Sequence, residues 1–223
     1  DRIVHEVQLP DGGSFHPKLW VTYYRPRNTR DTAGRPEIVR LICASRNLTT
    51  SQCWEAFVAL EGTVGTGTRS DALNTDIASC LESLVRPELR KAASYRALLA
   101  AVRKTQFTPA TPLRGSARLR WQGPGSGALD QYLPKSGRKA LVVSPFLGAT
   151  FLRPIQAGYQ EVIVISTQQA LDEISDPQVQ ARLATGKSRA YVVEPVDSDD
   201  QGPVLDLHAK IFVFENTNER TVF

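Results

Sequence analysis

Residues 139–166, KALVVSPFLGATFLRPIQAGYQEVIVIS, decide the fold class of this chain. Two short runs of apolar and β-branched residues, Lys139–Ser144 and Glu161–Ser166, are typical of strands buried in a parallel sheet. The segment between them, Leu147–Gly158, is predicted to form a helix. Strands that alternate with helices indicate an α/β fold.

The same alternation continues on both sides of this stretch. Downstream, Gln168–Leu183 is predicted to be helical with a break near Asp176-Pro177. Further strands are predicted at Ala190–Glu194 and Val204–Phe214. Upstream, the predicted strands are Arg2–Gln8, Phe15–Tyr24, Glu37–Ala44, Trp54–Leu60 and Ala117–Trp121, the predicted helices are Ala72–Val85 and Glu88–Lys104, and Gly62–Gly67 is predicted to be a loop.

A His-x-Lys motif occurs twice, as His16-Pro17-Lys18 and as His208-Ala209-Lys210. Only 7 of the 223 residues are lysines and only three are histidines, so two such pairs are not expected by chance. The motifs divide the chain into two strand-rich halves, 1–105 and 106–223, each with one motif. In a strand, residues i and i+2 point to the same face, so each His projects beside its Lys.

The second motif shows the expected alternation most clearly. On one face of the predicted strand lie Leu207, Ala209, Ile211 and Val213; on the other lie His208 and Lys210. An imidazole beside an ammonium suits a phosphate group. The ammonium neutralises phosphoryl oxygens, and the imidazole attacks phosphorus or transfers a proton.

A second polar element follows the predicted strand Glu37–Ala44. Ser45 and Asn47 stand two residues apart in the loop that leaves this strand. Their side chains are able to donate hydrogen bonds to a phosphate oxygen and to orient a histidine. By itself, Ser-x-Asn is more often a simple turn.

Together, these stretches resemble the phospholipase D superfamily. SFHPKLWV (14–21) and RLICASRNLT (40–49) are similar to its first His-x-Lys motif and the Ser-x-Asn element that follows, and LDLHAKIFVFE (205–215) is similar to its second motif. VVSPFL (142–147) resembles the segment that opens the second half in bacterial members. The resemblance implies two similar mixed-sheet α/β halves related by a pseudo-two-fold axis, with the site at their interface.

The resemblance also implies a mechanism without metal or cofactor. One histidine attacks the phosphodiester and forms a phosphohistidine, while the other protonates the leaving oxygen and later activates water. By similarity, we expect His16 to be the nucleophile and His208 the general acid and base, although a nearly symmetric site leaves the opposite assignment open. Lys18 and Lys210 would hold the phosphoryl oxygens, with Ser45 and Asn47 in support.

The chain departs from the family pattern in three places. Family members often carry Asp five residues after the motif lysine, where this chain has Tyr23 in the first half and Glu215 in the second. We expect Glu215 to serve in the site. A second Ser-x-Asn element is missing before the chain ends at Phe223. We therefore expect a piece of a longer protein with additional domains, of the helicase, restriction or defence type that bacterial members often accompany.

Composition favours nucleic acid over lipid as the partner. The formal net charge is +4 and the pI is about 9.1, with 20 Arg and 7 Lys. The three cysteines show neither metal-ligand spacing nor a disulfide framework, which indicates a reducing, cytoplasmic location. No signal peptide or transmembrane run is visible. Further candidates are Trp20 for base stacking, against packing on the strand face, and Arg46 for a phosphate contact, against a merely exposed Arg.

Three alternatives remain at this point. A phospholipase would use the same chemistry on membrane lipids, because the fold does not choose the phosphodiester. A non-catalytic domain of the same fold would bind nucleic acid or protein, but it would be expected to have lost a His or a Lys, and both pairs are intact. Finally, both motifs would be coincidental in an unrelated α/β domain.

Overall fold

The computed structural model describes residues 17–26, 35–47, 53–65, 71–85, 89–108, 116–121, 129–194 and 206–223. They fall into two compact units. Unit 1 lies within Asp1–Cys43 and Phe57–Gly127, and unit 2 within Ala44–Ala56 and Ala128–Phe223. The two halves 1–105 and 106–223 stay a prediction. Segment Ala44–Ala56 of the predicted first half belongs to unit 2 by its contacts. The predicted strand Arg2–Gln8 and His16 lie outside the described residues.

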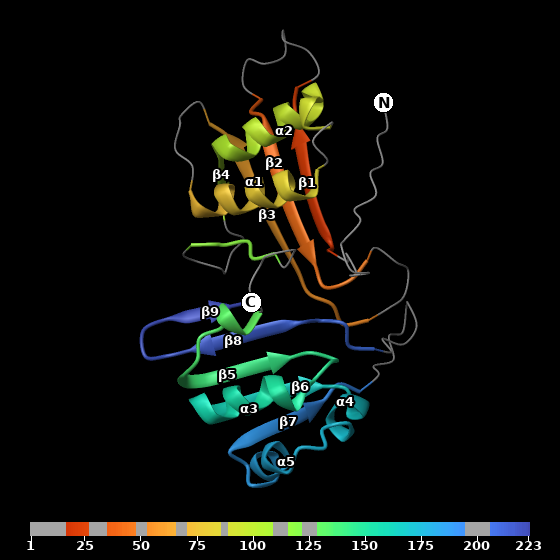
Figure 1. The fold of residues 1–223 in the computed structure, drawn as a ribbon, viewed down its shortest axis with the longest axis vertical. Coiled ribbons are helices and arrows are strands. Elements are labelled where there is room, and N and C mark those ends of the chain that lie inside the picture. Colours follow the sequence, from red (N-terminus) through yellow and green to blue (C-terminus); the bar gives the residue numbers. More distant parts are fainter. Residues whose placement is uncertain are drawn as a thin grey trace. The chain divides into compact units, whose positions relative to one another are not determined.

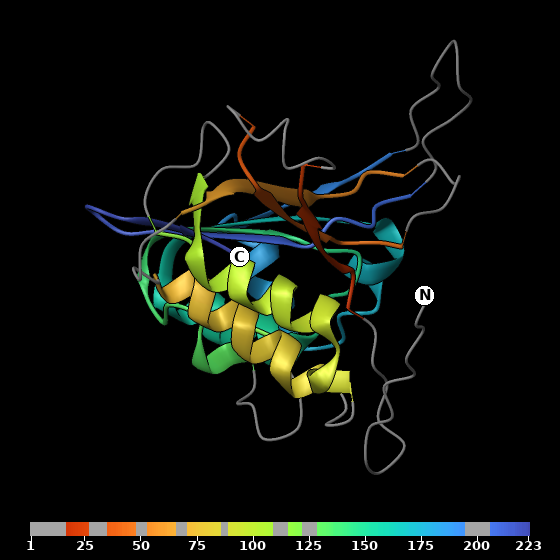
Figure 2. The same ribbon diagram turned by 90° about the horizontal axis from the view of Figure 1, so that it is seen from above.

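Unit 1 is a four-stranded antiparallel sheet with two helices. Its strands are β1 (Leu19–Tyr24), β2 (Ile38–Ala44), β3 (Phe57–Val64) and β4 (Thr105–Thr108), adjacent in that order (Figure 1). The helices α1 (Ala72–Leu84) and α2 (Ala93–Lys104) lie side by side along this sheet (Figure 2), with a short 3-10 turn at Leu89–Lys91 before α2.

Alternation along the strands builds the core of unit 1. Val39 and Leu41 in β2 and Leu60 in β3 are buried, while Arg40 and Glu61 between and beside them are exposed and form an ion pair at 2.6 Å. From the helices, the buried partners are Leu73, Ile77, Ala101 and Val102. The helices therefore cover one face of the sheet, and the apolar residues at i and i+2 in the strands face them.

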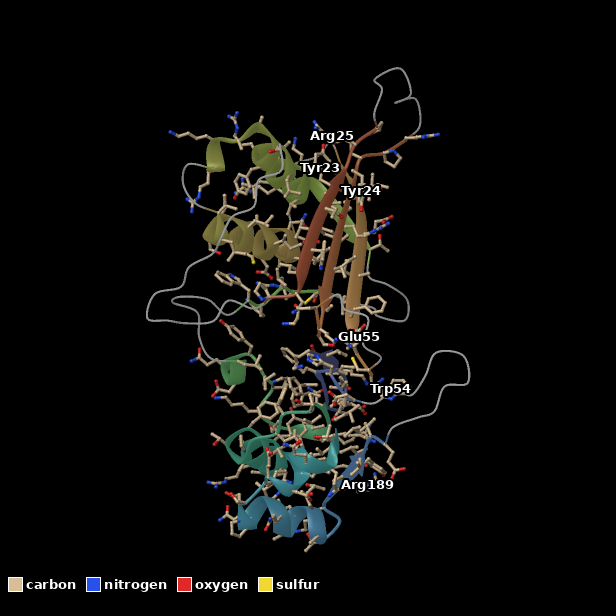
Figure 3. All side chains as sticks on the ribbon, turned by 90° about the vertical axis from the view of Figure 1, so that its right-hand side faces the viewer. Tyr23, Tyr24, Arg25, Trp54, Glu55 and Arg189 are labelled. Atoms are coloured by element: carbon tan, nitrogen blue, oxygen red, sulfur yellow. The ribbon has the colours of Figure 1, made fainter. Side chains whose placement is uncertain are left out.

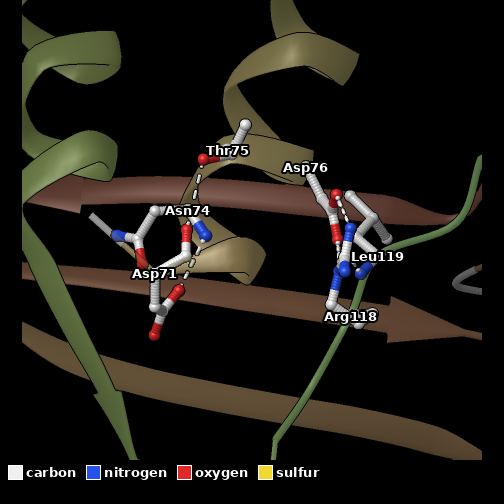
Figure 4. Close-up of polar contacts among 6 residues, drawn as sticks. All are labelled: Asp71, Asn74, Thr75, Asp76, Arg118 and Leu119. Atoms are coloured by element: carbon white, nitrogen blue, oxygen red, sulfur yellow. Dashed lines mark hydrogen bonds and ion pairs between the residues drawn. The ribbon is translucent and has the colours of Figure 1, made fainter.

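Polar contacts hold the segment 116–121 against α1 (Figure 4). Asp76 accepts bonds from Arg118 Nε at 2.6 Å and Nη2 at 2.8 Å, and from the backbone N–H of Leu119 at 3.1 Å. One turn earlier, Asp71 caps the helix by accepting from the N–H of Asn74 at 3.0 Å. The bonds of Asp76 hold residues 116–121 in place, although this segment is not paired with any strand of the sheet.

Replacing Asp76 by Asn should lower the stability of unit 1 in a pH-dependent way. Burial alone would raise the pKa of Asp76, but the bonds from Arg118 and Leu119 outweigh it and lower this pKa. The stabilisation is then complete above the unfolded-state pKa of about 3.9 and is lost as the pH falls through the folded-state value. We expect Asp76→Asn to lower the free energy of unfolding by about 1–2 kcal/mol at neutral pH, because Arg118 stays half-exposed.

Urea unfolding of both proteins at neutral pH and at successively lower pH measures this difference. It should stay constant down to about pH 5 and shrink below about pH 4. Asp172→Asn serves as a control and should behave like wild type, because Asp172 is an exposed residue of α4 whose carboxylate accepts a bond from the neutral Gln168 amide. A difference that is independent of pH would contradict the electrostatic origin of the effect.

Unit 2 is a five-stranded mixed sheet with helices. Its strands are β5 (Gly137–Val143), β6 (Tyr159–Ser166), β7 (Ser188–Val192), β8 (Ile211–Glu215) and β9 (Arg220–Val222), in the spatial order β7-β6-β5-β8-β9. Pairs β5–β6 and β6–β7 are parallel, whereas β5–β8 and β8–β9 are antiparallel. Helix α3 (Ala149–Gly158) connects β5 to β6, and α4 (Gln168–Asp172) and α5 (Pro177–Ala184) connect β6 to β7.

The core of unit 2 follows from the even-numbered residues of its central strands. Val142 and Val164 are directly opposite each other and fully buried, and Phe214 of β8 joins them. Leu152 of α3 and Val179 of α5 pack against this face. Helices on one face of a largely parallel core are what right-handed β-α-β connections produce.

The mixed α/β class is confirmed, and several boundaries need correction. Strand β3 runs through Gly62 to Val64, where a loop was predicted, and β4 was not predicted at all. Residues 117–121 are not a strand. The predicted strands Phe15–Tyr24 and Val204–Phe214 begin only at Leu19 and Ile211, so both lysines stand immediately before a strand rather than within it.

Candidate functional site

The second His-x-Lys motif lies directly before β8, the strand between β5 and β9 (Figure 1). Leu207 and Ala209 are buried, and His208 and Lys210 are half-buried, as the alternation predicted. The predicted continuation of this pattern is wrong, because Ile211 and Val213 are partly exposed and Phe214 is the buried residue of β8. The alternation of burial therefore shifts between the motif and the strand.

A segment distant in sequence explains this shift. The carbonyl of Trp54 accepts from the backbone N–H of both His208, at 2.7 Å, and Ala209, at 2.9 Å. The Trp54 N–H donates in turn to Asp206 at 2.8 Å, and Trp54 forms an isolated parallel bridge with Leu207. Two consecutive N–H groups on one carbonyl are incompatible with a regular ladder, so the chain is irregular at the motif.

Ser45 reaches the same part of unit 2 through this segment. Its backbone N–H donates to the Ala56 carbonyl at 2.8 Å, and its hydroxyl accepts from the Ala56 N–H at 3.0 Å. Trp54 stands two residues before Ala56 and bonds the histidine motif. Ser45 and Asn47 thus belong to the unit that holds His208 and Lys210, with Asn47 exposed and Ser45 half-buried.

The Lys210 ammonium is held beside the His208 ring. Its Nζ lies 3.3 Å from His208 Nδ1 and donates to the His208 carbonyl at 3.0 Å. The bond to the carbonyl fixes the position of the ammonium next to the ring. This arrangement places a positive charge beside an imidazole, a combination that suits a phosphate group.

An aromatic residue that the sequence did not single out completes this cluster. The Phe146 ring is 70% exposed, and its centroid lies 5.1 Å from Lys210 Nζ. This is the geometry of a cation–π contact. The signal was present in the Ser144-Pro145-Phe146 turn that follows a buried strand, where an aromatic residue has no core to fill.

Glu215 is not brought to His208. It lies five residues beyond Lys210 at the opposite end of β8, which places it on the order of 16 Å away along an extended chain. Its carboxylate forms ion pairs with Arg138 and, at 2.9 Å, with Arg220. These ion pairs connect β8 to β5 and β9, so Glu215 contributes to the pairing of the strands in this sheet.

The first motif is described only in part, because His16 lies outside the described residues. Pro17 is exposed and Lys18 half-buried, directly before β1, which is the outermost of the described strands of its sheet. Trp20 in β1 is 50% exposed opposite Ile42. Lys18 and Lys210 each precede a strand that pairs antiparallel with the next described strand along the chain.

The remaining sequence candidate, Arg46, contacts a cysteine, and its role in binding phosphate stays a prediction. Arg46 is half-buried, and its Nη1 contacts Cys53 Sγ. Trp54 is 52% exposed and, with Glu55, lies at the surface of its unit (Figure 3). Within the described part of the chain, no group of three or more His, Cys, Asp or Glu side chains is arranged to hold a metal ion. No described helix is both long and apolar enough to cross a membrane.

Comparisons with known proteins found no family model, no curated protein and no solved structure that matches this chain.

Proposed function

We propose that this chain is a metal-independent phosphodiesterase that cleaves DNA or RNA through a phosphohistidine intermediate. The observation that carries the proposal is the His208–Lys210 pair, in which an ammonium lies 3.3 Å from one ring nitrogen. Such a pair places positive charge and a proton donor at one point, as cleavage of a phosphodiester requires. The loop with Ser45 and Asn47 is bonded to the same motif through Trp54.

In the proposed reaction, His16 attacks phosphorus and the P–O bond to the leaving group breaks. His208, in its imidazolium form, donates a proton to the departing oxygen and becomes neutral. Water then attacks phosphorus, the P–N bond breaks and frees His16, and neutral His208 takes up the proton that the water loses, which restores both histidines. The lysines neutralise the non-bridging oxygens throughout. The opposite assignment of the two histidines fits the sequence equally.

The proposed substrate is nucleic acid, and the proposed location is the cytoplasm. The net charge of +4 favours a polyanion. A phospholipid offers the same bond and is the second candidate substrate. A non-catalytic nucleic-acid-binding domain is the remaining alternative, and the intact His208–Lys210 pair counts against it.

The test is cleavage by the full chain in the presence of EDTA. Labelled single- and double-stranded DNA, RNA and phosphatidylcholine vesicles are incubated separately, with wild type and with a His208→Ala control. We expect cleavage of nucleic acid by wild type that EDTA does not abolish. Strict dependence on a divalent metal would contradict the mechanism, cleavage of lipid alone would transfer the proposal to phospholipids, and tight binding without turnover would indicate the non-catalytic domain.

A further inference from the structure

We propose that Phe146 is a specificity-determining residue that stacks on an unpaired base next to the phosphate held at His208 and Lys210. This inference rests on the proposed function, because it names the form of nucleic acid that the site accepts. It assigns single-stranded or locally unpaired nucleic acid as the substrate, and it gives a binding role to a residue outside the two His-x-Lys motifs.

The position of Phe146 relative to the charged pair is the first argument. Its ring centroid lies 5.1 Å from Lys210 Nζ, and that Nζ lies 3.3 Å from His208 Nδ1. A phosphate bound by the ammonium is therefore within a few ångströms of an aromatic face. A nucleotide carries a flat base at a similar short distance from its phosphate, so one nucleotide is able to contact both groups.

The rigidity of the Phe146 turn is the second argument. The Ser144 hydroxyl donates to the Phe146 carbonyl at 2.8 Å and accepts from the Phe146 N–H at 3.1 Å. Ser144 is itself buried, donates its N–H to Ile165, and accepts at its carbonyl from the Ser166 hydroxyl at 2.7 Å. Because the ring is 70% exposed, it contributes little buried apolar surface to folding. Because its backbone is fixed, little conformational entropy is lost when a ligand stacks on it.

The neighbours of Phe146 favour a base over a lipid chain. The Lys210 ammonium lies over its ring and is itself next to the His208 imidazole, and the Ser144 hydroxyl bonds its backbone. These groups suit a polar ligand with a flat apolar face. A lipid surface requires a broader apolar entry. Bases within a duplex have both faces covered by their neighbours, so stacking on a protein ring selects unpaired bases.

The experiment measures binding in a variant whose cleavage is expected to be slow. His208→Gln keeps the backbone carbonyl that Lys210 contacts and removes the imidazole. Fluorescence anisotropy gives the dissociation constant of a labelled single-stranded DNA oligonucleotide and of a series with one abasic site at successive positions. The series is repeated with Phe146→Leu, Phe146→Tyr and the control Tyr191→Leu, an exposed aromatic residue of β7 separated from β5 by β6.

We expect one abasic position to weaken binding by about 5–100-fold when Phe146 is present. With Phe146→Leu, binding of the intact oligonucleotide should fall by a similar factor and the loss at that position should disappear. Phe146→Tyr and Tyr191→Leu should keep the wild-type profile. Matched duplex should bind more weakly than single strand in proteins with Phe146, and the difference should narrow in Phe146→Leu.

Three results would overturn the inference. The first is a positional profile unchanged by Phe146→Leu, and the second is equal binding of duplex and single strand. The third is failure to bind any oligonucleotide while phosphatidylcholine vesicles bind through Phe146, which would assign the ring to lipid. The cleavage assay is separate, so a coupled base–ring profile without turnover would retain the stacking site and refute the phosphodiesterase.

Discussion

Replacing His208 by alanine is expected to lower the rate of phosphodiester cleavage by about 10²–10⁴-fold, the range of a general acid and base. The imidazole is half-buried, and the N–H groups of His208 and Ala209 remain bonded to Trp54 because they belong to the backbone. The variant should therefore fold normally. Single-turnover cleavage of a labelled oligonucleotide measures the rate, and circular dichroism with urea unfolding measures the fold.

The leaving group distinguishes the role of His208. If His208 protonates the departing oxygen, a substrate with an acidic phenol as leaving group should recover much of the lost rate in His208→Ala, because such a group departs without a proton. His5→Ala is the matched control, since His5 is the one histidine without Lys at the second position after it. Wild-type turnover by His208→Ala would refute the mechanism, and an equal loss on both substrates would assign His208 as the nucleophile.

The sequence predicts the buried strands well and the short paired ones poorly. Runs such as 139–144 and 161–166 carry the β-branched residues that a covered parallel strand requires, and β5 and β6 form there. Strand β4 has only four residues and begins directly after α2, without a Gly, Pro, Asn or Asp between them that would predict a boundary. Gly62 of the neighbouring strand β3 is typical of a turn, but a side chain there would meet the Gln106 carbonyl at 2.3 Å, so the glycine permits close pairing of β3 and β4.

The candidate site shows the same division between local and distant information. The alternation of His208 and Lys210 with Leu207 and Ala209 is local, and it was predicted. The binding of Trp54 to this motif joins residues about 150 positions apart, which no local pattern encodes. The spacing of Glu215 from Lys210 predicts a place in the site. In an extended strand, however, each residue adds about 3.3 Å, so five residues place the two side chains far apart.

Replacing Lys210 by alanine is expected to lower cleavage by about 10²–10³-fold, as loss of one preorganised positive donor does at other transition states. The ammonium donates to the His208 carbonyl and approaches Nδ1, so its removal takes charge from the phosphate and a restraint from the ring. Lys210→Arg keeps the charge but changes the geometry, and it should recover only part of the rate. The loss should fall mainly on kcat, because charge develops on phosphoryl oxygens during the reaction.

Glu215→Gln is the control that distinguishes the effect of Lys210 from a general effect of changing a charged residue in or next to β8. The carboxylate is paired with Arg138 and Arg220 at the far end of β8, so its loss should lower the free energy of unfolding by about 1 kcal/mol or less. Cleavage should change by no more than about threefold, well below the effect of one lost transition-state donor. A loss for Glu215→Gln as large as that for Lys210→Ala would instead show that the carboxylate acts in the reaction, as its spacing first indicated. Since both residues belong to one continuous stretch, the comparison tests whether position along β8 decides the role.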